Sequence, residues 1–290
     1  MSERDDQFVN PIVDILCAEE EPPEWLIKDI LVQGAFTTLI GESGAGKSYV
    51  SYTLGLAVAA GVPALSGIVP KAEPKRVLYF DDENSRQDRD KYLRRAWLGL
   101  KALNGGKEPD LGLLLENFWP VGFALGGDDW ADKAEEWIVG LRPHLIVFDT
   151  ANACTNVDDE NSNAEATRAI KAMKRLMRIN EDQGVIASTL ALKHAKTRTE
   201  KGQIRTVRGA KVWKDMSDSV LFQVKLGGRP RKDGLSGTRL VPDKVRAYGL
   251  QQPIYIDPVW TDKARNGLQL NGSYKASNEH TRDEAKDDEE

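Results

Sequence analysis

The sequence is poor in cysteine and has no long apolar run, and both shortages exclude classes of protein. Its two cysteines, Cys17 and Cys154, are far apart and lack the close spacing of metal ligands. This favours a reducing, cytoplasmic setting in which both thiols are structural. No stretch of about 18 apolar residues is present, which excludes a membrane-spanning helix. Residues 1–6 are polar and acidic, unlike a signal peptide.

Acidic residues outnumber basic ones over the whole chain, 45 to 40, with one local exception. The formal net charge is -5, and an acidic total argues against a surface that binds nucleic acid throughout. Basic residues nevertheless gather between positions 193 and 214, where a local patch matters more than the total. Apolar residues make up 40% of the chain, enough for the core of one large domain or two small ones.

The clearest motif is a phosphate-binding loop that matches G-x-x-x-x-G-K-[ST] at every fixed position. Residues 36–40 before it are typical of a buried strand, and residues 49–60 after it of an apolar helix. The loop amides would surround phosphates, Lys47 would contact the β- and γ-phosphates, and the Ser48 hydroxyl would hold Mg²⁺. The predicted nucleotide-binding residues are Gly41, Glu42, Ser43, Gly44, Ala45, Gly46, Lys47, Ser48 and Tyr49.

Carboxylates follow two further predicted strands. The strand at 76–80 leads into Asp81, Asp82, Glu83 and Asn84, at the strand end where ligands bind in α/β sheets. We predict that Glu83 orients the attacking water, with Asp82 as second choice. An acidic cap on a helix at 85–103 is the alternative, and both roles are compatible. The strand at 145–148 ends in Asp149, a predicted Mg²⁺ ligand.

The last part of the predicted domain combines a histidine with many basic residues. His194 closes a strand at 185–193 and is either a γ-phosphate sensor or an ordinary surface histidine. Residues 195–207 have no apolar period and are predicted to form a flexible loop. This loop is either a contact for nucleic acid phosphates or a solvated charge run. Its predicted nucleic-acid contacts are Lys196, Arg198, Lys201, Arg205 and Arg208.

Two basic residues near the C-terminus suggest a contact between subunits. Lys244 and Arg246 alternate onto one face if the strand beginning near 237 continues. They are either finger residues that complete a neighbour's nucleotide site or protective charges on an edge strand. Further short strands are predicted at 111–119 and 253–256. The predicted organisation is an N-terminal arm at 1–21, one α/β domain at 22–260, and a disordered acidic tail at 261–290.

As an ordered set, these motifs resemble those of RecA-like ATPases of the RepA and KaiC type, often encoded by phages and plasmids. The resemblance covers about residues 22–256 and includes the entry Pro-Pro-Glu-Trp-Leu-Ile at 22–27. Glu83 matches the family's catalytic glutamate, Asp149 its Walker B aspartate and His194 its sensor. Arg208-Gly209-Ala210 and Lys244-Val245-Arg246 resemble two further elements. Asp218 stands near where the plasmid helicases have a finger arginine, and Ala210 replaces a serine.

The resemblance implies a RecA-like α/β fold with a mostly parallel twisted sheet and an antiparallel C-terminal extension. It implies Mg²⁺-dependent ATP hydrolysis by a homo-oligomer, a hexameric ring whose basic loops contact single-stranded DNA, with RNA as an alternative. The expected function is a replicative helicase or translocase, with a replication partner for the acidic tail. A recombinase-type filament and a KaiC-like regulatory ATPase acting on proteins are the alternatives.

Overall fold

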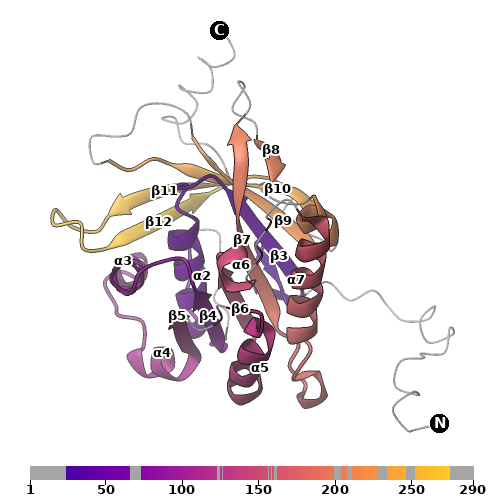
Figure 1. Ribbon diagram of the computed structural model, residues 1–290. Coiled ribbons are helices and arrows are strands. Elements are labelled where there is room, and N and C mark those ends of the chain that lie inside the picture. Colours follow the sequence, from indigo (N-terminus) through magenta and orange to yellow (C-terminus); the bar gives the residue numbers. More distant parts are fainter. Residues whose placement is uncertain are drawn as a thin grey trace, which may run out of the picture.

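A central sheet with helices on both faces dominates the computed structural model (Figure 1). The structure describes residues 24–65, 73–122, 125, 127–155, 157, 159, 162–198, 204–207, 211–226, 234–245 and 252–274. Within them the sheet has 10 strands, in the order β12-β11-β10-β9-β3-β7-β6-β4-β5 with β8 paired to β7. The strands are β3 (Phe36–Gly41), β4 (Val77–Asp81), β5 (Phe118–Gly122), β6 (Leu145–Asp149), β7 (Ser188–Arg198), β8 (Ile204–Val207), β9 (Ser219–Lys225), β10 (Thr238–Val245), β11 (Ile254–Trp260) and β12 (Leu268–Ser273).

The centre of the sheet is parallel, and its strand ends bring the motif residues together. Strand β3 lies between β7 and β9, and its last residue, Gly41, is paired with His194 and Gln223. Strand β6 lies between β7 and β4, which places Asp81 directly beside Asp149. Because these strands run the same way, the phosphate loop and the acidic strand ends share one edge of the sheet.

Two helical layers cover the parallel strands. The helices are α2 (Lys47–Ala60), α3 (Arg86–Leu103), α4 (Leu111–Asn117), α5 (Trp130–Leu141), α6 (Ala151–Thr155), α7 (Asn163–Leu176) and α8 (Val212–Met216). Along β4, Val77 and Tyr79 pack with the α2 and α3 layer, whereas Leu78 and Phe80 pack with α5 to α8. Burial on both faces explains why these strands are almost continuously apolar.

The chain enters this sheet through a separate two-stranded antiparallel pair, β1 (Trp25–Ile27) and β2 (Leu31–Val32). A 3-10 turn, η2 (Glu181–Gln183), precedes β7. None of the helices in the described part of the chain combines the length and apolar character needed to cross a membrane. The fold class expected from the sequence is confirmed: a mostly parallel α/β sheet with an antiparallel extension, β10 to β12, at its C-terminal end.

The strand expected at 111–119 is wrong for most of its length. Residues Leu111–Asn117 form α4, and the strand β5 begins only at Phe118. The Asp110 side chain explains the helix because it accepts hydrogen bonds from the backbone of Gly112 and Leu113 at 2.8 and 3.3 Å. A capped run of leucines favours a helix over a strand.

The flexible loop expected at 195–207 is also corrected. Strand β7 continues to Arg198, and β8 returns antiparallel to it, with Ala195 paired to Val207 and Arg198 to Ile204. Between them lies the segment 199–203, outside the described residues. The pairing residues include Thr197, Ile204 and Val207, whose β-branched side chains favour strands despite the surrounding charges.

The boundary expected at residue 260 falls too early. Strand β12 pairs with β11 beyond it, and Leu268 and Leu270 are buried against the core that contains α3. Gly99 of α3 allows a close approach, since a Cβ there would lie 2.0 Å from the Leu268 carbonyl oxygen. The predicted arm at 1–21 and the acidic stretch 275–290 lie outside the described residues.

Candidate nucleotide-binding site

A cleft of about 510 Å³ opens at the carboxyl edge of the parallel strands. Residues 43–50 form one wall. Glu83 follows β4, Asp149 ends β6, and His194 lies within β7 rather than closing it as expected. Side chains from α3 and from β9 to β12 line the rest. The structure therefore brings Lys47, Ser48, Glu83, Asp149 and His194 to a single cavity, whereas Gly41, Glu42 and Lys244 do not line it.

The loop between β3 and α2 has the backbone that its glycines permit. Gly44 and Gly46 have φ angles of 69° and 86°, in the left-handed region that favours glycine. Gly46 caps the N-terminus of α2, whose first amides face the cleft. Gln223 of β9 also stabilises the loop, because its buried amide nitrogen donates to the Ala45 carbonyl at 2.7 Å.

Lys47 is buried at the floor of this loop, with 6% of its surface exposed. Its ammonium donates to the carbonyls of Gly41 and Glu42 at 3.0 and 3.1 Å, and it lies 3.4 Å from His194 Nδ1. Burial lowers the pKa of Lys47, and the nearby Asp149 carboxylate opposes that shift. A phosphate bound at the loop would place negative charge beside this buried ammonium and so favour its charged form.

His194 joins Lys47 to Glu83. Its Nε2 lies 3.2 Å from Glu83 Oε1, while Nδ1 faces Lys47. The hydrogen bond from His194 holds the pKa of Glu83 below its ordinary value, against the effect of burial. Glu83 is therefore an ionised carboxylate that can accept a hydrogen bond from water. His194, the predicted sensor, contacts both Lys47 and Glu83.

Ser48 and Asp149 form the expected place for Mg²⁺. The Ser48 hydroxyl hydrogen-bonds the Asp149 carboxylate, whose pKa is raised to about 7 by burial and by the adjacent Asp81. No group of three or more His, Cys, Asp or Glu side chains within the described ranges could hold a metal ion. Mg²⁺ usually takes one or two protein ligands and completes its shell with substrate phosphates and water. A hydroxyl beside a buried carboxylate fits that pattern.

A network of buried hydroxyls around Asp149 was missed by the sequence analysis. The Tyr79 hydroxyl donates to Asp149 Oδ2 at 2.8 Å and lies 2.6 Å from Ser51 Oγ. The Ser51 hydroxyl also donates to the Ser48 carbonyl at 3.0 Å, which links this network to the residue after Lys47. In the same layer, the Tyr52 hydroxyl donates to Asp81 Oδ2 at 2.7 Å. The sequence signal for this network is the presence of hydroxyl side chains, Tyr79 in a strand and Ser51 and Tyr52 in a helix, among apolar neighbours.

Asp82, the second choice for a catalytic base, faces elsewhere. Its carboxylate accepts a hydrogen bond from the backbone of Leu125 at 2.9 Å, and it does not line the cleft. The alternative helix-cap role belongs to Ser85, whose hydroxyl accepts from the backbone of Asp88 at the start of α3. Glu83 is thereby left in the cleft without a capping role in that helix.

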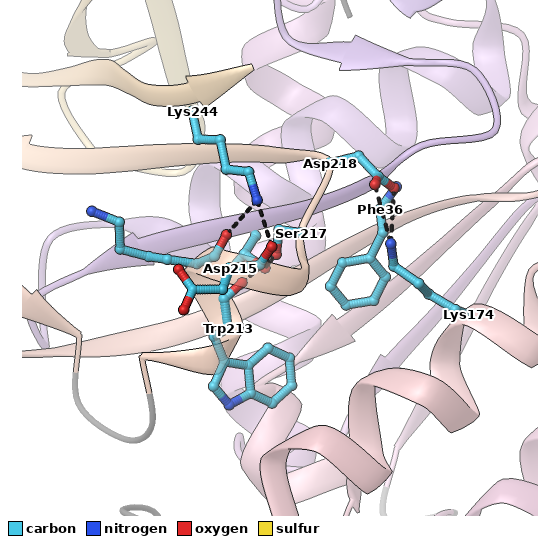
Figure 2. Close-up of polar contacts among 9 residues, drawn as sticks. Phe36, Lys174, Trp213, Asp215, Ser217, Asp218 and Lys244 are labelled. Carbon is cyan, nitrogen blue, oxygen red and sulfur yellow. Dashed lines mark hydrogen bonds and ion pairs between the residues drawn. The ribbon is translucent and has the colours of Figure 1, made fainter. Parts of the chain in front are cut away.

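Lys244 makes contacts within its own chain (Figure 2). Its ammonium donates to the carbonyls of Lys214 and Asp215 at 2.9 and 2.6 Å, which satisfies the C-terminal end of α8. In the β10–β9 ladder it is paired with Val220 rather than with the last residues of β9. Its contribution to a neighbour's site stays a prediction, and Arg246 lies outside the described residues.

Asp218 has a structural role within the chain. Its carboxylate accepts from the backbone of Phe36 at 3.0 Å and forms an ion pair of 3.1 Å with Lys174 of α7 (Figure 2). It therefore ties the start of β3 to a covering helix.

The predicted nucleic-acid contacts are only partly described. Lys196 and Arg198 belong to the backbone of β7, and Arg205 belongs to β8, so these three share a hairpin. Lys201 and Arg208 lie outside the described residues. Their role in binding stays a prediction.

Comparison with known proteins agrees with this geometry. A family model described as an AAA domain matches residues 5–199, more than half of the chain. The chain belongs to this family. The AAA domain match includes the phosphate loop, Glu83, Asp149 and His194, whereas β9 to β12 lie beyond it. Together with the loop, it makes the protein a P-loop ATPase domain.

A search of curated proteins found no match for this AAA domain. Among solved structures, a KaiC-like protein from the hyperthermophilic archaeon Pyrococcus horikoshii is similar over 87% of this chain and 97% of its own. The sequence identity is 14% and the TM-score is 0.49.

Proposed function

We propose that this protein is a Mg²⁺-dependent ATPase that moves along or unwinds single-stranded DNA, as a ring-forming replicative helicase or translocase. The observation that carries the ATPase part is the contact chain from Lys47 through His194 to Glu83, inside the cleft of the phosphate loop. It supports the proposal because His194, the proposed sensor, contacts both the proposed phosphate-binding cation and the proposed general base.

The residues at the loop end of the cleft have distinct proposed roles in hydrolysis. The loop amides and Lys47 bind the phosphates, and Ser48 with Asp149 would hold Mg²⁺, which neutralises charge on the phosphates when bound. Glu83 is ionised and orients the attacking water. His194 contacts Glu83 directly, so a γ-phosphate that draws Lys47 or His194 toward it also changes the position of the base.

The DNA part of the proposal is supported by β7. This strand carries His194 at the cleft and continues without a break to Arg198 and the hairpin with β8. Lys196, Arg198 and Arg205 on that hairpin, with Lys201 and Arg208, supply positive charge for a phosphate backbone. A nucleotide-dependent shift of β7 would therefore reach the proposed DNA contact along a single strand.

We further propose that the active form is a homo-oligomeric ring, a hexamer, in which Lys244 and Arg246 approach the nucleotide of a neighbouring subunit. Strand β10 carries Lys244 beside α8, the helix that follows the basic segment. In such a ring the acidic residues 275–290 would be available to a replication partner.

The test is the ATPase rate with no nucleic acid, with single-stranded DNA and with single-stranded RNA, each at low and high salt. Lys47→Ala should abolish the rate, and Glu83→Gln should lower it by about 10²-fold or more while nucleotide binding is kept. DNA should raise the wild-type rate at low salt and less at high salt.

The DNA contact is tested with two triple-alanine variants. Replacing Arg198, Lys201 and Arg205 should remove the stimulation, whereas replacing the exposed Lys107, Arg168 and Lys171 should leave it intact. A robust wild-type rate that neither DNA nor RNA changes would overturn the motor and direct attention to protein partners. Stimulation by RNA alone would overturn the choice of DNA.

A further inference from the structure

We propose that α3 and the hairpin β11–β12 form a subsite for the base of a purine nucleotide. The inference rests on the proposed binding of ATP phosphates at the loop and deepens it by naming the class of base. The family match ends at residue 199, so the β-strand part of this subsite is built by residues outside the AAA domain.

The lining of the cleft changes from polar and charged at one end to largely apolar at the other. Its loop end is polar and charged, with Lys47, Glu83 and Asp149. The rest of its lining includes an apolar group from the C-terminal strands and the turn before them, comprising Leu235, Ile256, Pro258, Trp260, Leu268 and Leu270. A nucleotide has the same two-part character, and an apolar wall with a few polar groups is typical of ligand pockets.

Cationic and aromatic groups meet at the apolar end of the cleft. The Arg95 guanidinium of α3 lies 4.9 Å from the centre of the Trp260 ring, and that of Arg265 lies 5.8 Å from it. Arg95 Nη1 also donates to the Tyr49 hydroxyl at 2.8 Å. Tyr49 in turn packs edge-on against Tyr92, with ring centres 4.7 Å apart. Guanidinium and aromatic planes are the surfaces on which nucleic acid bases stack.

Tyr49 connects these aromatic and cationic groups to the phosphate loop. Tyr49 directly follows Ser48, the predicted Mg²⁺ ligand, and is itself part of the cleft lining. Its contact with Arg95 therefore places these groups beside the phosphate site rather than in a separate pocket.

The wall is held in place before any ligand binds. Helix α3 packs closely on β12 at Gly99, and Leu268 and Leu270 are 5% and 3% exposed. A preformed wall lowers the cost of ordering on binding. Because stacking depends on area and every base has a flat face, the two-ring purines should bind better than pyrimidines, with little distinction between adenine and guanine.

The experiment is calorimetric binding of ATP, GTP, CTP and inorganic tripolyphosphate to the full chain. Arg95→Ala and Trp260→Leu should each weaken ATP and GTP binding by about tenfold, in the range measured for lost base stacking. Both should leave tripolyphosphate binding unchanged and reduce the preference for ATP over CTP. Trp260→Leu keeps an apolar side chain in the wall, and Trp260→Phe should retain most of the affinity.

The matched controls are Arg94→Ala, the exposed neighbour on α3, and Trp137→Ala, an exposed tryptophan of α5 in the opposite layer. Neither should change any affinity. Equal losses for ATP and tripolyphosphate in Arg95→Ala would overturn the subsite by making Arg95 a phosphate ligand. Unchanged ATP binding in both test variants, or equal wild-type affinity for ATP and CTP, would also overturn it. If wild type bound neither ATP nor tripolyphosphate, the proposed function itself would fail.

Discussion

At the scale of single residues, the Tyr79 hydroxyl stands out because it is polar in an otherwise apolar strand. It donates to Asp149 and lies 2.6 Å from the hydroxyl of Ser51, which lies one helical turn after Ser48. Buried hydroxyls that satisfy a carboxylate fix its orientation, and partners of this kind are important for metal affinity. We therefore regard Tyr79 as a positioning residue for the proposed Mg²⁺ ligand.

Removing that hydroxyl should weaken metal binding without unfolding the protein. We expect Tyr79→Phe to raise the Mg²⁺ concentration needed for nucleotide binding by about tenfold or more. Titrating a fluorescent nucleotide with Mg²⁺ measures this, and nucleotide binding without Mg²⁺ should stay the same. Tyr52→Phe is the control, because it removes a similar hydroxyl from Asp81 instead of Asp149. Equal Mg²⁺ requirements in wild type and Tyr79→Phe would refute the role.

His144 predicts a second residue-scale effect, on stability at low pH. It accepts a hydrogen bond from the backbone of Arg76 through Nδ1 at 3.3 Å. Burial, followed by the charges of Lys75 and Arg76, lowers its pKa from 6.5 to about 4. The unfolded chain then binds the proton more readily than the folded one, so this contribution to stability is present above pH 6.5 and is lost as the pH falls toward 4.

Urea unfolding of wild type and His144→Gln at pH 7.5 and 4.5 tests this. Glutamine keeps an acceptor for the Arg76 amide but does not titrate, so the variant should lose less stability on acidification, by about 1 kcal/mol for a half-buried group. Parallel losses in the two proteins would contradict the assignment.

Sequence reasoning succeeded at the residues whose types are set by chemistry. The loop pattern, Glu83 and His194 were predicted, and the structure brings them together. It did not predict that Tyr79 and Asp81 lie next to Asp149, because that contact depends on β4 pairing with β6. That placement depends on pairing between strands far apart in sequence, which local patterns do not encode.

At the scale of elements, the errors share a physical origin. Residues 111–117 became a helix through the Asp110 cap, and β8 and β12 formed because a partner strand was available. Short strands of mixed polarity have weak intrinsic preferences, so tertiary pairing decides their conformation. The long apolar strands and the helix α2 were predictable because burial on both sides dictates their composition.

The packing of α3 on β12 gives a prediction at this scale. Gly99→Ala should destabilise the protein by about 1 to 3 kcal/mol, because the added Cβ would meet the Leu268 carbonyl. Gly140→Ala in α5 is the matched control, since nothing lies within 4 Å of its Cβ. That change should stabilise the helix by about 0.5 to 1 kcal/mol. Denaturant unfolding of the two variants should move the midpoint in opposite directions, and a shift in the same direction would argue against the tight contact.

At the scale of the whole molecule, strand β12 lies past the domain boundary expected from composition. A chain ending at residue 260 lacks β12 and its buried leucines, and should lose roughly 3 kcal/mol or more of stability. A chain ending at residue 274 keeps β12 and the hydrogen bond from Tyr274 to Asp29, and should unfold like the full chain. Comparing thermal unfolding of the three lengths checks this, and equal stability of the shortest form would place the boundary back at 260.

The position of β3 in the sheet has one more consequence. On one side, β7, β6 and β4 lead to the groups proposed to act on the phosphates, and on the other, β9 to β12 line the rest of the cleft. The two sets of strands meet only at the loop strand. Apart from Tyr49 and Arg95, the residues proposed for turnover and for ligand choice thus lie in separate stretches of sequence, so substitutions in β11 and β12 can alter the choice of ligand while the proposed hydrolysis residues are preserved.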